Sequence, residues 1–84
     1  MGSTRHKPAR LAEKLKTVRE RLGLTLDQMA IALSDGELSV VRQDIWRYER
    51  GMTDPPLLIL LRYSRLSKVK MEVFADDDLS LDSN

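Results

Sequence analysis

Apolar residues recur at helical spacing in successive stretches of the chain, separated by short polar segments. The first stretch predicts a helix of about 14 residues with one buried stripe, formed by Leu11, Leu15, Val18 and Leu22. Pro8 suits the first position of this helix, because proline lacks the N–H that would have no partner there. Gly23 follows the stripe and is typical of the left-handed residue that ends a helix.

A capping box predicts the start of the second helix. The Thr25 hydroxyl is placed to accept from the N–H of Gln28, whose side chain reaches back. The apolar positions of this short helix are Leu26, Met29, Ala30 and Leu33. A polar turn follows, and Ser39 is the expected N-cap of a third helix. We expect that helix to end at Gly51 and to direct three side chains inward, those of Val41, Ile45 and Tyr48.

The second half of the chain predicts two more helices. Asp54 is the expected N-cap of the fourth, with Pro55 and Pro56 in its first positions. This helix runs to about Leu66, and its expected core face consists of Leu57, Leu60, Leu61 and Ser64. A last short amphipathic turn or helix carries the apolar residues Val69, Met71, Val73 and Phe74.

The fold class predicted is all-α, a bundle of about five short helices, because no segment alternates convincingly between apolar and polar residues. With 84 residues, the chain has room for one domain. We expect a flexible basic arm at residues 1–8, the helical domain at 9–75, and a disordered acidic tail at 76–84.

Composition argues against most catalytic and cofactor-binding classes. The chain has no cysteine and one histidine, so disulfides, thiolate metal sites and histidine clusters are not expected. We therefore expect no enzyme activity, no metal and no cofactor. There is no apolar run of the ~20 residues that span a bilayer, and the first residues lack a signal-peptide core. A cytoplasmic location is the default expectation.

Charge is distributed unevenly along the chain, although the net charge is only +1. Residues 1–21 carry seven basic and two acidic residues, whereas residues 76–84 carry four aspartates and no base. A basic body suits an anionic partner, above all nucleic acid, but an ordinary solvated surface has the same appearance.

The order of a capped short helix, a turn and a helix with polar outer positions is that of a helix-turn-helix, whose second helix enters the DNA major groove. Residues 19–30, RERLGLTLDQMA, resemble the opening of the Cro/phage-repressor family, often called the XRE family. Residues 45–51, IWRYERG, resemble the end of its recognition helix. Asp54-Pro55 with residues 57–61 resembles its fourth helix, and residues 69–74 its fifth, so that the likeness covers residues 9–75.

This resemblance implies a sequence-specific, double-stranded DNA-binding transcriptional regulator, usually a dimer. The positions that match base contacts are Arg42, Gln43, Asp44, Trp46 and Arg47. Their chemistry is suitable, since arginine pairs with guanine, glutamine with adenine, and aspartate accepts from cytosine. The expected phosphate contacts are Arg5, Lys7, Arg10, Thr25, Gln28 and Arg50.

Several departures from the family pattern favour an alternative, a protein-interaction module on the same fold. The turn at residues 34–40 is about four residues longer than usual, Leu26 stands where the family often has glutamine, and Met52 stands where it often has a base. Trp46 has three open interpretations: a partner of DNA, an anchor for a protein partner, or a partly buried cover of the core. Glu49 is expected to form a structural ion pair with Arg19 or Arg50.

Overall fold

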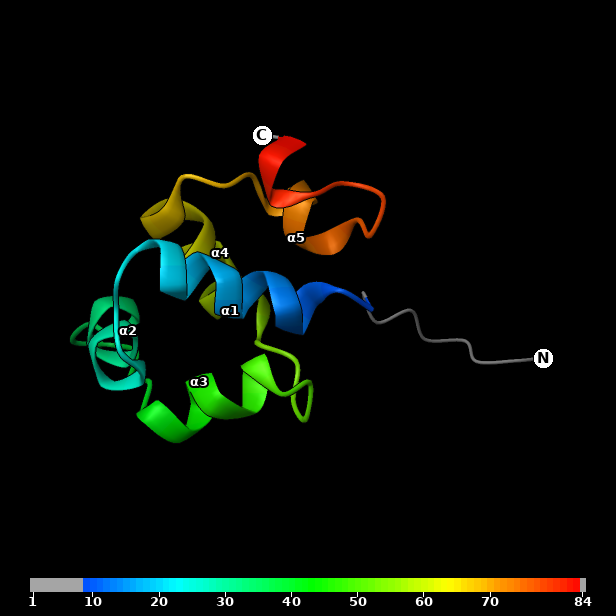
Figure 1. Cartoon of the computed structure of the whole chain (residues 1–84). Helices are drawn as coiled ribbons and strands as arrows, with labels where there is room; N and C mark the ends of the chain where they lie inside the picture. Colours follow the sequence, from blue (N-terminus) through cyan, green and yellow to red (C-terminus); the bar gives the residue numbers. More distant parts are fainter. Residues whose placement is uncertain (1–8, 84) are drawn as a thin grey trace.

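The computed structural model describes residues 9–83, and in this range the chain folds into five α-helices and a final 3₁₀ turn (Figure 1). The helices are α1 (Leu11–Arg21), α2 (Leu26–Leu33), α3 (Arg42–Glu49), α4 (Leu57–Ser67) and α5 (Met71–Ala75), followed by η1 (Leu81–Ser83). There is no strand among the described residues, so the all-α prediction is confirmed. Pro8 lies outside the described residues.

The first two helices form where the sequence predicts them. Gly23 has φ +72°, which lets the chain turn sharply after α1. At the start of α2, Thr25 Oγ1 accepts from the Gln28 N–H at 3.1 Å and Gln28 Oε1 accepts from the Thr25 N–H at 2.9 Å. The inward residues of both helices are buried as expected, namely Leu11, Leu15, Val18, Met29, Ala30 and Leu33. Leu22 is exposed, contrary to expectation, because it is the C-cap at which the chain leaves the core.

Helix α1 runs through the middle of the molecule, with α3 on one side and α5 on the other (Figure 1). Helix α2 packs against both α3 and α4. The core between them includes Ile45, Tyr48, Ile59, Tyr63 and Phe74, and the rings of Tyr63 and Phe74 meet edge to face at 6.5 Å. Among residues 9–83, no helix is long and apolar enough to cross a membrane.

Helix α3 begins later than the sequence predicts, and its first apolar residue is not in the core. Val41 is the N-cap in place of Ser39 and is 50% exposed, whereas its neighbour Val40 is buried. The physical reason is the long connecting loop, residues 34–41, which turns Val40 inward and leaves Val41 in an extended conformation outside the helix. The predictions for Ile45 and Tyr48 are confirmed, since both are buried.

Helix α4 also begins later than predicted and faces the core differently. Its N-cap is Pro56, in an extended conformation, so neither Asp54 nor Pro55 belongs to the helix or its cap. Leu57 is 75% exposed, and the fully buried residues are Ile59 and Tyr63. Residues 57–61 are all apolar and are therefore compatible with several core faces. Packing selects the helix face that buries the ring of Tyr63. As a result, Leu60, Leu61 and Ser64 are only half-buried.

The C-terminal segment, residues 76–83, differs from the expected disordered tail because it packs along α1. Asp77 accepts from the backbone N–H groups of Ala9 at 2.8 Å and Arg10 at 3.0 Å, so its carboxylate lies at the positive end of α1. Leu81 is half-buried against the core, and Asp82 lies 3.2 Å from Arg21 at the other end of α1.

Lys14 completes this attachment from the middle of α1. Its side chain is 2% exposed, and its ammonium donates to the carbonyl oxygens of Val73 at 2.6 Å and Asp76 at 2.9 Å. Carbonyls at a helix C-terminus carry partial negative charge, so this cation stabilises the end of α5.

Candidate nucleic-acid interface

Within residues 9–83, no other helix covers one face of α3, which lies along the edge of the molecule (Figure 1). Gln43, Trp46, Arg47 and Arg50 are all exposed and follow the i, i+3, i+4, i+7 spacing of a single helix face. We call these four residues the α3 strip. Ile45 and Tyr48 point to the opposite side, into the core. The pattern of exposed and buried residues on α3 thus agrees with the polar outer face that the sequence predicts.

A bidentate ion pair fixes the C-terminal end of α3 to α1. Arg19 Nε and Nη2 donate to the two carboxylate oxygens of Glu49 at 2.7 and 3.0 Å. Arg19 Nη1 also donates to the Leu24 carbonyl at 2.9 Å. The side chains are 15% and 6% exposed, so the pair is largely shielded, and the hydrogen bond to Glu49 raises the pKa of Arg19. The predicted ion pair of Glu49 with Arg19 is confirmed, and it sets the direction in which the α3 strip faces.

The first turn of α3 lies beside the first turn of α2. The guanidinium of Arg42, which is exposed, lies 3.5 Å from the carboxylate of Asp27. Asp44 is half-buried, and its Oδ2 accepts from the Val41 N–H at 3.0 Å, while Oδ1 lies 4.0 Å from Arg47 Nη1. Asp44 therefore caps the helix, and of the five expected base contacts it is the one whose side chain is turned back towards the backbone.

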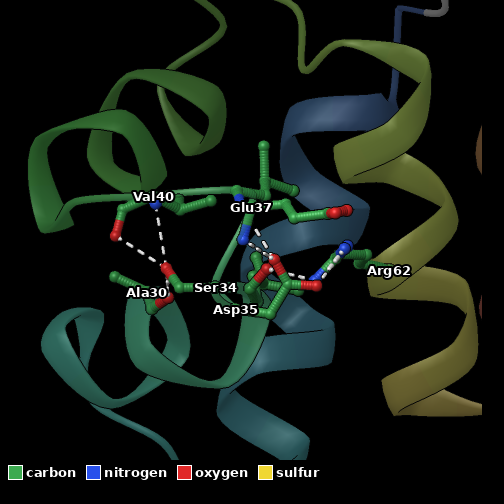
Figure 2. A network of polar contacts seen from close by, with 8 residues as sticks. Ala30, Ser34, Asp35, Glu37, Val40 and Arg62 are labelled. Carbon is green, nitrogen blue, oxygen red and sulfur yellow. Dashed lines mark hydrogen bonds and ion pairs between the residues drawn. The ribbon is translucent and has the colours of Figure 1, made fainter.

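The connecting loop is fixed by internal hydrogen bonds (Figure 2). Ser34 Oγ accepts from the Val40 N–H at 2.9 Å and lies 2.7 Å from the Ala30 carbonyl, to which it donates. Asp35 Oδ1 accepts from the N–H groups of Glu37 and Leu38, both at 2.8 Å. The connecting loop thus forms an ordered structure that closes on itself.

Arg62 joins this loop to α4. Its Nη2 donates to Asp35 Oδ2 at 2.6 Å, and its Nη1 donates to the Leu33 carbonyl at 3.3 Å (Figure 2). The hydrogen bond from Arg62, together with those from the two loop N–H groups, lowers the pKa of Asp35. The dipeptide Asp35-Gly36 is a turn signal, but nothing in the sequence links it to a residue of α4.

The expected phosphate contacts fall into two groups. Thr25 and Gln28 are exposed in the first turn of α2, next to the start of α3, and Arg50 lies at the end of the α3 strip. Arg10 is the N-cap of α1, at the opposite end of that helix from Thr25 and Gln28, and its guanidinium donates to the Asp77 carbonyl at 3.1 Å. Arg5 and Lys7 lie outside the described residues.

Comparison of the chain with protein-family models, with curated proteins and with solved structures found no match. Among the described residues, no group of three or more His, Cys, Asp or Glu side chains is arranged to hold a metal ion.

Proposed function

We propose that the chain binds double-stranded DNA in a sequence-specific manner, as a transcriptional regulator, with α3 in the major groove. The observation that carries the proposal is the α3 strip, an exposed polar and aromatic helix face on a helix held in place from behind. A major groove about 12 Å wide admits one α-helix, and side chains at this spacing all point to the same side.

The residues of α3 match the hydrogen-bonding groups of base edges. The amide of Gln43 both donates and accepts, as the N6 and N7 atoms of adenine require. The guanidinium groups of Arg42 and Arg47 provide paired donors for O6 and N7 of guanine. Rigid attachment through the Arg19–Glu49 pair favours specificity, because base contacts require a defined helix orientation.

Phosphate contacts would come from the edges of the same surface. The N-terminal N–H groups of α2 carry partial positive charge and lie next to the start of α3, as the contact between Asp27 and Arg42 indicates. Arg50 extends the cationic surface at the other end of α3. The basic residues Arg5 and Lys7 would add further neutralised phosphates.

A protein-interaction module is the second candidate, because α3 also exposes apolar surface. Val41 at its start and Trp46 in its middle are both exposed. Aromatic residues of this kind are common anchors of protein interfaces. Binding of a protein partner through these apolar side chains would not depend on the cationic residues of the α3 strip, whereas DNA binding would. Neutralising those cationic residues therefore separates the two candidates experimentally.

The test is binding of the full chain to a labelled pool of random-sequence 20-bp duplexes at about 50 and 200 mM salt. Neutralised phosphates release counterions, so the affinity should fall steeply between the two salt concentrations. The amide resonances that shift should cluster at residues 42–50 and 25–28. Shifts that avoid α3, or binding that is indifferent to salt, would refute the proposal.

A matched pair of arginine variants sharpens the test. Arg47→Ala and Arg65→Ala each remove one exposed positive charge, the first from the α3 strip and the second from α4. We expect Arg47→Ala to weaken duplex binding about tenfold and Arg65→Ala by less than twofold. Equal effects would indicate a general charge attraction without a defined interface.

A further inference from the structure

Trp46 is an apolar ring in the middle of a polar surface. It is 41% exposed, and the other members of the α3 strip are Gln43, Arg47 and Arg50. A tryptophan side chain gains free energy when it leaves water, so an exposed ring at the centre of a contact surface needs an apolar partner. Polar and charged neighbours on its own helix do not provide one.

Arg50 holds this ring in a defined position. The guanidinium carbon lies 4.9 Å from the centre of the Trp46 ring, which is a cation–π contact. The backbone N–H of Arg50 also donates to the Trp46 carbonyl at 3.1 Å, at the C-cap of α3. The cation–π contact therefore favours one orientation of the indole before any ligand arrives, which reduces the entropy lost on binding.

We propose that Trp46 reads the C5-methyl group of a thymine, an inference that rests on the proposed function. Base edges in the major groove present hydrogen-bond donors and acceptors and one apolar group, the thymine methyl. Gln43 and Arg47 suit the polar groups, and the ring of Trp46 suits the methyl.

The spacing along the helix also predicts where this thymine lies. Gln43 and Trp46 are three residues apart, which is about 4.5 Å along the helix axis. Neighbouring base pairs are stacked ~3.4 Å apart. The thymine contacted by Trp46 should therefore belong to the base pair next to the one that Gln43 contacts.

The experiment begins with selection of tightly bound duplexes from a randomised 20-bp library by the full chain. In the best duplex, each thymine is then replaced in turn by deoxyuridine, which removes only the methyl group. We expect at least one replacement to weaken binding about fourfold, the effect of exposing one buried methyl group. The Trp46→Ala variant should bind the thymine and deoxyuridine duplexes equally well.

Arg47→Ala is the control, because it changes the α3 strip and leaves the indole in place. It should weaken binding to both duplexes and keep the fourfold ratio between them, because the methyl contact belongs to the indole of Trp46. Absence of any methyl-sensitive thymine, or a ratio that persists in Trp46→Ala, would overturn this inference while leaving DNA binding intact. If selection enriches no duplex, the proposed function itself fails, and this inference with it.

Discussion

Arg62 on α4 donates to Asp35 Oδ2 at 2.6 Å and so attaches the loop that precedes α3 to a helix that begins after α3 ends. The same guanidinium donates to the Leu33 carbonyl, the last carbonyl of α2. One side chain thus joins the end of α2, the connecting loop and α4. Since α3 follows this loop directly, its position depends on a residue of α4.

We expect removal of this contact to loosen the loop more than it destabilises the whole domain. Arg62→Met keeps the apolar part of the side chain and removes its donors, and the amide protons of Glu37 and Leu38 should exchange several-fold faster. Asp35→Ala should have the larger effect, because it also removes the acceptor of both N–H groups. Hydrogen exchange followed by NMR measures both effects. Unchanged exchange in Arg62→Met would show that the loop does not depend on α4.

Glu49→Ala should be strongly destabilising, because it leaves the largely shielded Arg19 guanidinium without its two carboxylate acceptors. We expect a loss of about 2–3 kcal/mol in the free energy of unfolding, measured by urea denaturation. Glu13→Ala is the matched control, since Glu13 pairs with Arg10 on the open surface at 3.5 Å. That change should cost less than about 1 kcal/mol. Similar losses in the two variants would contradict the structural role of the Arg19–Glu49 pair.

Asp77 should make the stability of the fold sensitive to acid. Hydrogen bonds from the backbone N–H groups of Arg10 and Ala9 lower the pKa of Asp77 below its ordinary value of 3.8. A carboxyl whose pKa is lower in the folded state contributes stability above its unfolded pKa, and this contribution is lost as the pH falls through the folded value. Stability should therefore fall with pH below about 4.

Asp77→Asn should lower stability at neutral pH and reduce this acid dependence, which thermal unfolding between pH 2.5 and 7 measures. Asp35, whose pKa is also lowered, contributes to the acid dependence of stability in the same pH range. Because Asp35 is still present in Asp77→Asn, part of the acid dependence should persist in this variant. The control is Asp78→Asn, which changes an exposed neighbour of the same type. An acid dependence that is identical in Asp77→Asn and the native chain would exclude Asp77 as its source.

Tyr63→Phe should leave the fold as stable as before or more stable by about 1 kcal/mol. The Tyr63 hydroxyl is buried and has no hydrogen-bond partner among the described residues, and burial raises its pKa. Tyr63→Ala, in contrast, removes the ring that packs against Phe74 and should cost about 3–5 kcal/mol. Urea denaturation of both variants makes the comparison. A loss of more than 1 kcal/mol in Tyr63→Phe would show that the hydroxyl has a partner.

The sequence by itself determined the parts of this protein that depend on near neighbours in the chain. Three such features are the capping box of Thr25 and Gln28, the left-handed Gly23, and the buried stripe on α1 through Val18. Each of them involves only residues that are close to one another in the sequence, at most about three helical turns apart. The outward face of α3 was also predictable, because Ile45 and Tyr48 define the buried side at helical spacing. These features need no knowledge of what packs against them.

Only the tertiary structure decided the features for which the local pattern allows several solutions. The apolar run at residues 57–61 is compatible with several core faces of α4, and packing around Tyr63 selected one. The burial of Val40 in place of Val41 follows from the fold of the loop, in which Ser34 bonds to Val40 and Arg62 of α4 bonds to Asp35. Each of these outcomes involves contacts between residues far apart in the chain.

The C-terminal segment shows most clearly that contacts between distant residues decide local structure. Its aspartates indicate a solvated tail when they are considered alone, because a local count of charges contains no partner for them. In the folded chain, the N–H groups at the start of α1 donate to the carboxylate of Asp77, and the ammonium of Lys14 donates to the carbonyls at the end of α5. The start of α1 and the end of α5 each have backbone groups without a partner inside their own helix, and residues distant in the sequence provide the partners. The position of the C-terminal segment is therefore decided by the tertiary structure.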